Sequence, residues 1–167
     1  MTCNIYAVAE YRESDYWYGF STLHISKNYN LFALMADVHN YNETICVARA
    51  KGYPKNGMSF IFKHLYFKFV VEDSYEDNSV ISKSKAQYWK KEYMIDVLDE
   101  GTAYEMISSP DWHDCSWLET VELIEVQQQL KLQLDMESKE LDAIINMLLV
   151  FDPELKGNAR ICFFFDN

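Results

Sequence analysis

The residues Ala159–Phe165, ARICFFF, decide the fold that this sequence predicts. An unbroken apolar run of this length is typical of a strand that is buried on both faces. The backbone N–H and C=O groups of a buried strand need hydrogen-bond partners. We therefore predict that this closing strand lies beside the opening strand of the chain in one sheet.

The opening residues form the expected partner. Cys3–Tyr11 and Tyr16–Phe20 are rich in aromatic and branched side chains, and the polar Arg12–Asp15 separates them, which predicts a β-hairpin. A further strand is expected at Thr44–Ala48, within a loop. Met58–Val71 alternates aromatic residues with lysines, and we interpret it as a strand.

Apolar residues at helical spacing predict helices in the first half of the chain. Asn28 can cap a helix over residues 29–38, and a second helix is expected from about Ala86 to near Gly101. The block Asn28–Asn40 could be a recognition element, but the spacing of its apolar residues favours a place in the core.

A helical hairpin is predicted near the end of the chain. Ser116–Glu119 (SWLE) has the pattern of a capping box, so a helix should begin at Ser116 and continue to about Asp135. A second helix should follow from about Ser138, with one apolar face, until Asp152 and Pro153 stop it.

Together these elements predict one α+β domain over residues 1–167. We expect a mainly antiparallel sheet with adjacent N- and C-terminal strands, packed against the helical hairpin and one or two further helices. The length suits one domain. Hydrophobic residues make up 49% of the chain, which argues against intrinsic disorder.

Membrane and secreted classes are not expected. The longest apolar runs, Ile144–Phe151 and Ile161–Phe165, are shorter than the roughly 18 residues of a membrane span. No secretory signal is visible at the N-terminus. The cysteines are scattered singly, so we expect free thiols in an intracellular protein. They are Cys3, Cys46, Cys115 and Cys162.

The negative charge is concentrated in the second half of the chain. The formal net charge is -11, and residues 96–167 contain 16 acidic and 4 basic residues, whereas residues 1–95 contain 10 and 11. No Lys or Arg occurs between Glu92 and Leu130. Direct nucleic-acid binding through such a surface is not expected, because polyanions require cationic partners.

Three blocks resemble a family of bacteriophage proteins of similar length and unknown function. They are Asn28–Asn40 (NYNLFALMADVHN), His113–Leu118 (HDCSWL) and Arg160–Asn167 (RICFFFDN). Gly52–Pro54 stands where the family has Gly-Leu-Pro, and residues about 60–100 do not match. The resemblance implies a phage accessory protein in the host cytoplasm, with inhibitors of host defence systems such as CRISPR nucleases among the possibilities.

The acidic second half suggests how such a protein could act. Carboxylates ordered on a rigid surface can imitate the phosphates of nucleic acid and occupy a basic groove on a host or defence protein. The alternative is that the charge serves solubility alone. The carboxylates that we expect to contact the partner are Asp99, Glu100, Glu105, Glu122 and Glu125.

The competing hypothesis is a small metal-dependent or thiol hydrolase centred on His113 and Cys115. Both side chains can ligate zinc, but no further ligands follow in a recognisable spacing. A thiol at a helix start has a lowered pKa, whereas Asp111 and Asp114 oppose formation of the thiolate. We expect no catalytic residue, metal or cofactor.

Overall fold

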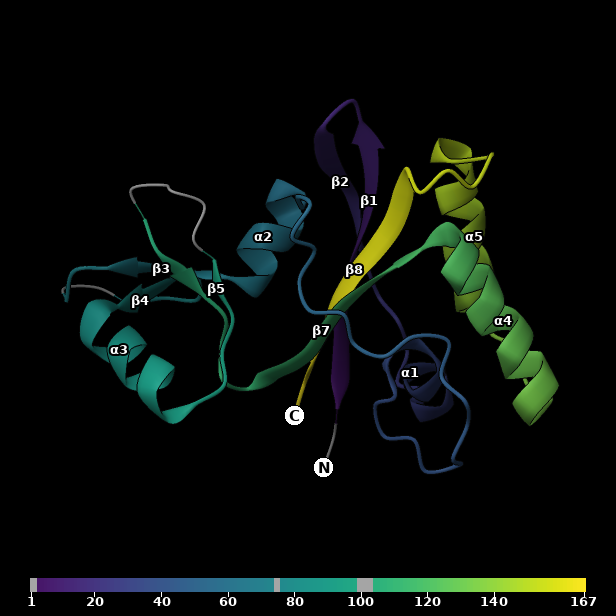
Figure 1. Cartoon of the computed structure of the whole chain (residues 1–167), viewed down its shortest axis with the longest axis horizontal. Coiled ribbons are helices and arrows are strands. Elements are labelled where there is room, and N and C mark those ends of the chain that lie inside the picture. The colour runs from purple at the N-terminus through teal and green to yellow at the C-terminus, as the bar shows by residue number, and fades with distance from the viewer. Residues whose placement is uncertain (1–2, 74–75, 99–103) are drawn as a thin grey trace.

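The strands that begin and end the chain lie side by side in sheet A. The computed structural model describes residues 3–73, 76–98 and 104–167. Sheet A has the order β2-β1-β8-β7, with antiparallel neighbours throughout. Its strands are β1 (Asn4–Glu13), β2 (Tyr16–Leu23), β7 (Trp112–Glu119) and β8 (Ala159–Asp166). The predicted α+β fold and the pairing of the terminal strands are confirmed (Figure 1).

Strand β8 is apolar apart from Arg160 and Asp166, because both faces of sheet A are covered. Ile161, Phe163 and Phe165 belong to a core cluster with the helices on one face. Cys162 and Phe164 belong to a second cluster on the other face. Alternate side chains of a strand point to opposite faces, so burial on both sides requires consecutive residues that are apolar or, like Arg160, paired with a buried partner.

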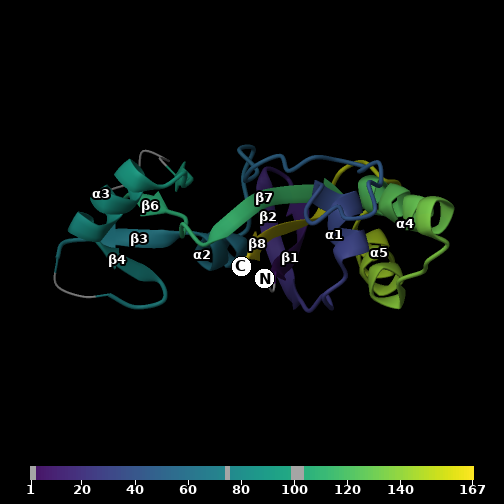
Figure 2. The same cartoon turned by 90° about the horizontal axis from the view of Figure 1, so that it is seen from below.

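The first face of sheet A is covered by three helices that the sequence predicts, although α4 begins later than expected. They are α1 (Tyr29–Ala36), α4 (Thr120–Leu134) and α5 (Lys139–Phe151). The side chains of Asn28 and Ser138 accept hydrogen bonds from the first turns of α1 and α5, which satisfies N–H groups that a helix leaves free. Helices α4 and α5 form the predicted hairpin at one end of the molecule (Figures 1 and 2).

A second, smaller sheet lies on the other side of sheet A and was not anticipated. Sheet B has the order β4-β3-β6-β5, with one parallel pair, β3 and β4. Its strands are β3 (Lys68–Val71), β4 (Val80–Ser82), β5 (Val97–Leu98) and β6 (Met106–Ile107). With α2 (Phe60–Tyr66) and α3 (Lys83–Glu92) it forms the second lobe (Figures 1 and 2).

The interpretation of Met58–Val71 as one strand is wrong in its first half. The segment forms α2 and then β3. The Ser59 hydroxyl accepts a hydrogen bond from the N–H of Phe62 and caps the helix. Phe62 and Tyr66, four residues apart, are both buried, so the aromatic residues have helical as well as alternating spacing.

The predicted helix start at Ser116 is also wrong. Ser116 is a buried residue of β7, and its hydroxyl accepts a hydrogen bond from the N–H of Lys51 at 3.1 Å. Helix α4 begins four residues later, where Glu122 accepts a hydrogen bond from the N–H of Glu119 at 2.9 Å. Pairing of β7 with the buried β8 extends the strand past the local capping signal.

Two further predictions differ from the structure. Thr44–Ala48 is irregular rather than a strand, because the Asn40 side chain bonds both the N–H and the C=O of Thr44 and holds the chain in a turn. Helix α3 ends at Glu92, and Leu98 lies in β5.

Among the described residues no helix is long and apolar enough to cross a membrane.

A buried ion pair joins the two central strands of sheet A. Arg160 on β8 and Glu10 on β1 are 1% and 0% exposed, and Arg160 Nε donates to Glu10 Oε2 at 2.9 Å. The guanidinium also donates to the carbonyl of Gly57 at 2.6 Å and lies 3.5 Å from the ring centroid of Trp17. Gly57 has φ of +109°, which favours glycine. The other oxygen of Glu10 accepts the N–H of Ser59 at 2.7 Å.

We predict that Arg160→Met lowers the free energy of unfolding by about 3–5 kcal/mol, because it leaves the Glu10 carboxylate buried without its cation. The double variant Glu10→Gln with Arg160→Met should recover part of this loss, since no unpaired charge remains. Arg12→Met, at an exposed arginine of the same sheet, is the control and should change stability by less than about 1 kcal/mol. Urea unfolding measures all three, and a stable Arg160→Met single variant would contradict the role of the pair.

Candidate functional site

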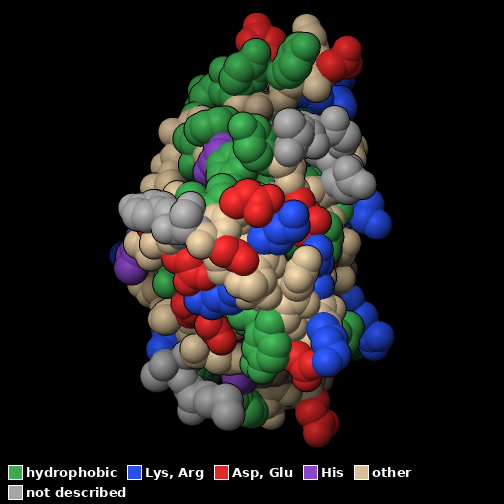
Figure 3. All heavy atoms as spheres, turned by 90° about the vertical axis from the view of Figure 1, so that its left-hand side faces the viewer, with side chains coloured by type: hydrophobic (Ala, Val, Ile, Leu, Met, Phe, Trp, Pro, Cys, Tyr) green, Lys and Arg blue, Asp and Glu red, His purple; other side chains and the backbone are tan. Residues whose placement is uncertain are grey.

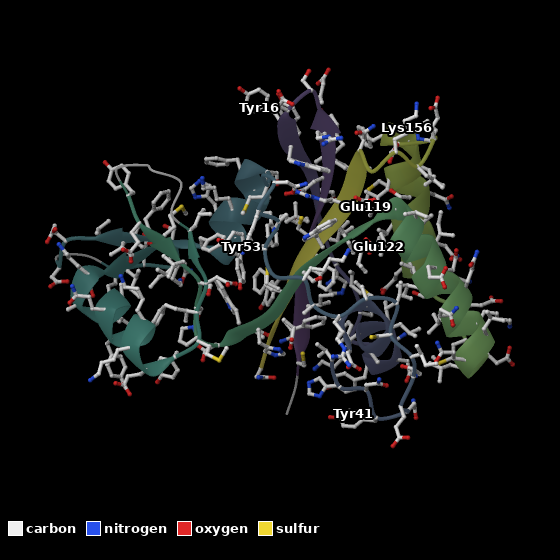
Figure 4. All side chains as sticks on the ribbon, viewed as in Figure 1. Tyr16, Tyr41, Tyr53, Glu119, Glu122 and Lys156 are labelled. Carbon is white, nitrogen blue, oxygen red and sulfur yellow. The ribbon has the colours of Figure 1, made fainter. Side chains whose placement is uncertain are left out.

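Two of the predicted carboxylates lie on α4 in different surroundings. Glu122 contacts Lys51 Nζ at 2.5 Å and also accepts the N–H of Glu119. Figure 4 shows Glu119 and Glu122 at the start of the helix. Glu125 is exposed and accepts a hydrogen bond from the Gln129 amide at 3.0 Å. Glu122 therefore stabilises the fold, whereas Glu125 is available to a partner.

The remaining predicted carboxylates lie far from α4 or outside the described residues. Glu105 precedes β6 in the second lobe, at the opposite end of the molecule from α4 (Figures 1 and 2), and contacts Lys90 Nζ at 2.6 Å. Asp99 and Glu100 are outside the described residues. The structure thus does not bring Glu105, Glu122 and Glu125 together on one surface.

The segment around His113 and Cys115 lies in β7 rather than at a helix start. His113 Nδ1 is 2.7 Å from Asp114 Oδ2, and the strand register is irregular between His113 and Ser116. Cys115 is 4% exposed. Burial raises the pKa of its thiol, and the nearby Asp96 carboxylate raises that pKa further. The helix-start environment expected to favour a thiolate is therefore absent at Cys115.

A cleft of about 730 Å³ separates β7 from the segment that joins α3 to β5. The Tyr66 hydroxyl donates to Asp96 Oδ2 at 2.6 Å, and the N–H of Asp96 donates to Ser108 Oγ at 2.9 Å. Burial raises the pKa of Tyr66. Trp112 and His113 line the same cleft. Sequence reasoning missed Tyr66 and Asp96 because no motif relates them.

The cleft thus has a polar wall built from distant segments. Tyr66 is the last residue of α2, Asp96 precedes β5, and Trp112 begins β7. Among the described residues, no group of three or more His, Cys, Asp or Glu side chains is arranged to hold a metal ion. The lining of the cleft includes the Tyr66 hydroxyl, the Asp96 carboxylate and the Trp112 ring, which can contribute hydrogen bonds, charge and aromatic contact.

A group of exposed and half-buried side chains, most of them aromatic, lies on α2, on β3 and just before β6. Phe60 is 75% exposed and its ring centroid is 3.9 Å from that of His64. Ring contacts continue from His64 to Phe69 at 5.1 Å and from Phe69 to Tyr104 at 6.3 Å. On the side of the molecule shown in Figure 3, which is the left-hand side of Figure 1, hydrophobic side chains gather around a histidine in the upper part. We call Phe60, Ile61, His64, Phe69 and Tyr104 the aromatic surface.

Comparisons of the chain with family models, with curated proteins and with solved structures found no match. The phage resemblance therefore rests on its three blocks alone. In the structure these blocks form α1 with the turn after it, much of β7, and most of β8.

The preference for a core role of Asn28–Asn40 is confirmed. Its apolar residues are buried beneath sheet A, and Asp37 ends α1 in a left-handed conformation with φ of +61°. The Asn40 side chain then ties Asp37 to the backbone of Thr44. The buried apolar residues of α1 include Leu31, Phe32, Leu34 and Met35.

We predict that Cys115 resists alkylation in the folded protein. The thiolate is the reactive form, and burial both raises the Cys115 pKa and blocks access. Iodoacetamide at pH 8 should modify the partly exposed Cys46 before Cys115, and urea should equalise the two. Peptide mass spectrometry measures both sites. Labelling of Cys115 in the native protein faster than Cys46 would instead favour a nucleophilic role.

Proposed function

We propose that this protein is a bacteriophage accessory protein that binds a host protein in the host cytoplasm and blocks it without catalysis. The partner class that we favour is a nucleic-acid-handling or defence protein, such as a CRISPR nuclease. The observation that carries the proposal is the aromatic surface. The phage origin rests on the three sequence blocks.

Exposed aromatic side chains of this kind suit a protein interface. Burying a Phe side chain contributes about 1.5–3 kcal/mol relative to leaving it exposed, yet Phe60 is 75% exposed in the isolated chain. Aromatic residues are enriched among the few side chains that dominate binding energy, and contiguous apolar patches mark interaction sites. Phe60, His64 and Phe69 form such a patch through successive ring contacts.

The second lobe is also the part of the chain without family resemblance. Residues about 60–100 lie outside the three blocks, and they form α2, β3, β4, α3 and β5. The blocks mostly build sheet A and α1, which hold the core together. This division supports a shared scaffold carrying a recognition lobe specific to this protein.

The negative charge supports a basic partner. Several carboxylates of the second lobe form ion pairs with lysines, as in the Lys83–Glu72 and Lys85–Glu76 pairs. Attraction of a basic partner does not require one contiguous acidic patch. A net charge of -11 still attracts a basic protein over about one Debye length and accelerates association. We therefore assign steering to the charge and affinity to the aromatic surface.

The alternative hydrolase at His113 and Cys115 has weaker support. A thiol nucleophile requires the thiolate, and burial of Cys115 favours the protonated form. His113 has Asp114 as the hydrogen-bond partner of its Nδ1 atom. We therefore favour binding over catalysis.

We predict that Phe60→Ala weakens capture of the host partner at least about tenfold, as expected for a central interface aromatic. Partners are first identified by pull-down from host lysate and then titrated against each variant by interferometry. Leu132→Ala is the matched control, because Leu132 is equally exposed but lies on α4. The melting temperatures of both variants should stay near that of the parent.

Equal affinities of Phe60→Ala and the parent chain would refute the assignment of the aromatic surface. Weaker binding by Leu132→Ala alone would move the interface to the helical hairpin. A phage-type inhibitor should also reduce the activity of the captured host protein, whereas binding without inhibition would contradict the blocking role.

Charge reversal on α4 should separate steering from stability. Glu125→Lys should slow association severalfold at low salt and leave the melting temperature unchanged, because Glu125 is exposed. The difference should vanish near 1 M salt, where the Debye length is about 3 Å. Glu122→Lys should in addition lower the melting temperature, since Glu122 pairs with Lys51 and accepts the N–H of Glu119. An association rate independent of both changes would remove steering from the proposal.

A further inference from the structure

We propose that the cleft between β7 and the α3–β5 segment binds a guanidinium group. This inference concerns a second site, and it does not rest on the aromatic surface or on the host partner. The cleft volume of about 730 Å³ is within the range of about 300–1,000 Å³ that is usual for small-ligand sites. The chemistry of its wall identifies the ligand class.

A carboxylate without a cationic partner lies in this wall. Asp96 Oδ2 accepts the Tyr66 hydroxyl, and among the described residues no Lys or Arg forms an ion pair with Asp96. Lys90 also lines the cleft, but its Nζ is 2.6 Å from Glu105. The cleft can thus accept a cation at Asp96 without displacing an internal ion pair.

Aromatic rings line the same cleft as Asp96. Tyr66 is 2% exposed and stacks on Trp112, with ring centroids 5.8 Å apart and planes at 27°. The rings open to a ligand are therefore those of the half-buried Trp112 and the exposed Tyr93, which both line the cleft. Lys68 Nζ lies 5.7 Å from the Trp112 ring, so this indole already contacts a cation. A planar guanidinium can stack on an aromatic ring and bond a carboxylate in two places.

The remaining polar atoms favour a ligand that only donates hydrogen bonds. His113 Nδ1 contacts Asp114 Oδ2 at 2.7 Å. The Asp96 and Asp114 carboxylates of the cleft wall accept hydrogen bonds. A guanidinium offers five N–H donors and no acceptor. An anionic ligand would instead meet the carboxylates of Asp96 and Asp114.

The test uses the full chain and blocked arginine, N-acetyl-arginine amide, as the probe. Its citrulline analogue has nearly the same shape without the charge. We expect blocked arginine to change the tryptophan fluorescence saturably and to bind at least about tenfold more tightly than the citrulline analogue, consistent with a lost charged contact. Asp96→Asn, which keeps an oxygen for the Tyr66 hydroxyl, should abolish the preference.

Asp111→Asn is the matched control, because Asp111 is exposed and does not line the cleft. Equal affinity for arginine and citrulline in the parent chain, or an unchanged preference in Asp96→Asn, would overturn the proposal. So would the absence of saturable binding by blocked arginine. If Asp96→Asn melts at a lower temperature, the ligand comparison on the parent chain decides the outcome.

A second arm identifies the source of the guanidinium. A peptide with one central arginine is titrated beside blocked arginine alone. Tighter binding of the peptide indicates that the cleft receives an arginine side chain of a polypeptide, and equal binding indicates a free small molecule. Both results support the guanidinium site. Because no host protein is present, failure of the proposed function leaves this test unaffected.

Discussion

The contact between Arg160 and Glu10 is the interaction on which the rest of the structure depends. It joins β8 to β1 in the buried centre of sheet A. It also extends to the second lobe, because Glu10 accepts the N–H of Ser59, whose hydroxyl caps α2. Two buried charges are tolerated only with complementary hydrogen bonds, so the pair restrains each segment that it contacts.

The positions of the aromatic surface and of the cleft follow from this arrangement. Helix α2 begins at the buried pair, presents Phe60 on the aromatic surface, and ends at Tyr66 in the cleft. Phe164 of β8 holds the end of that helix, since its ring lies 5.0 Å from Tyr66 and 4.8 Å from Trp112. Sheet A therefore serves as the rigid support, and the second lobe presents the groups available for recognition.

Charge in this protein acts at two ranges. At short range, Glu10, Glu122 and Glu105 each contact a named cation and contribute to the fold. At long range the excess of -11 remains, and it affects encounter rates and solubility rather than the geometry of a site. The number of carboxylates in the sequence indicates the long-range effect of charge. It cannot show which carboxylates form short-range ion pairs, because these pairs join residues that are distant in the chain.

The sequence by itself determined the elements whose signals are local. The apolar residues of β8, the cap at Asn28, the start of α5 near Ser138 and the stop at Asp152 each depend on a few consecutive residues, and all were predicted. Ser116 had an equally clear local signal, yet β-pairing with β8 placed it in a strand. Only the tertiary structure brought Tyr66, Asp96 and Trp112 into one cleft, because contacts between distant segments depend on packing that no local pattern records.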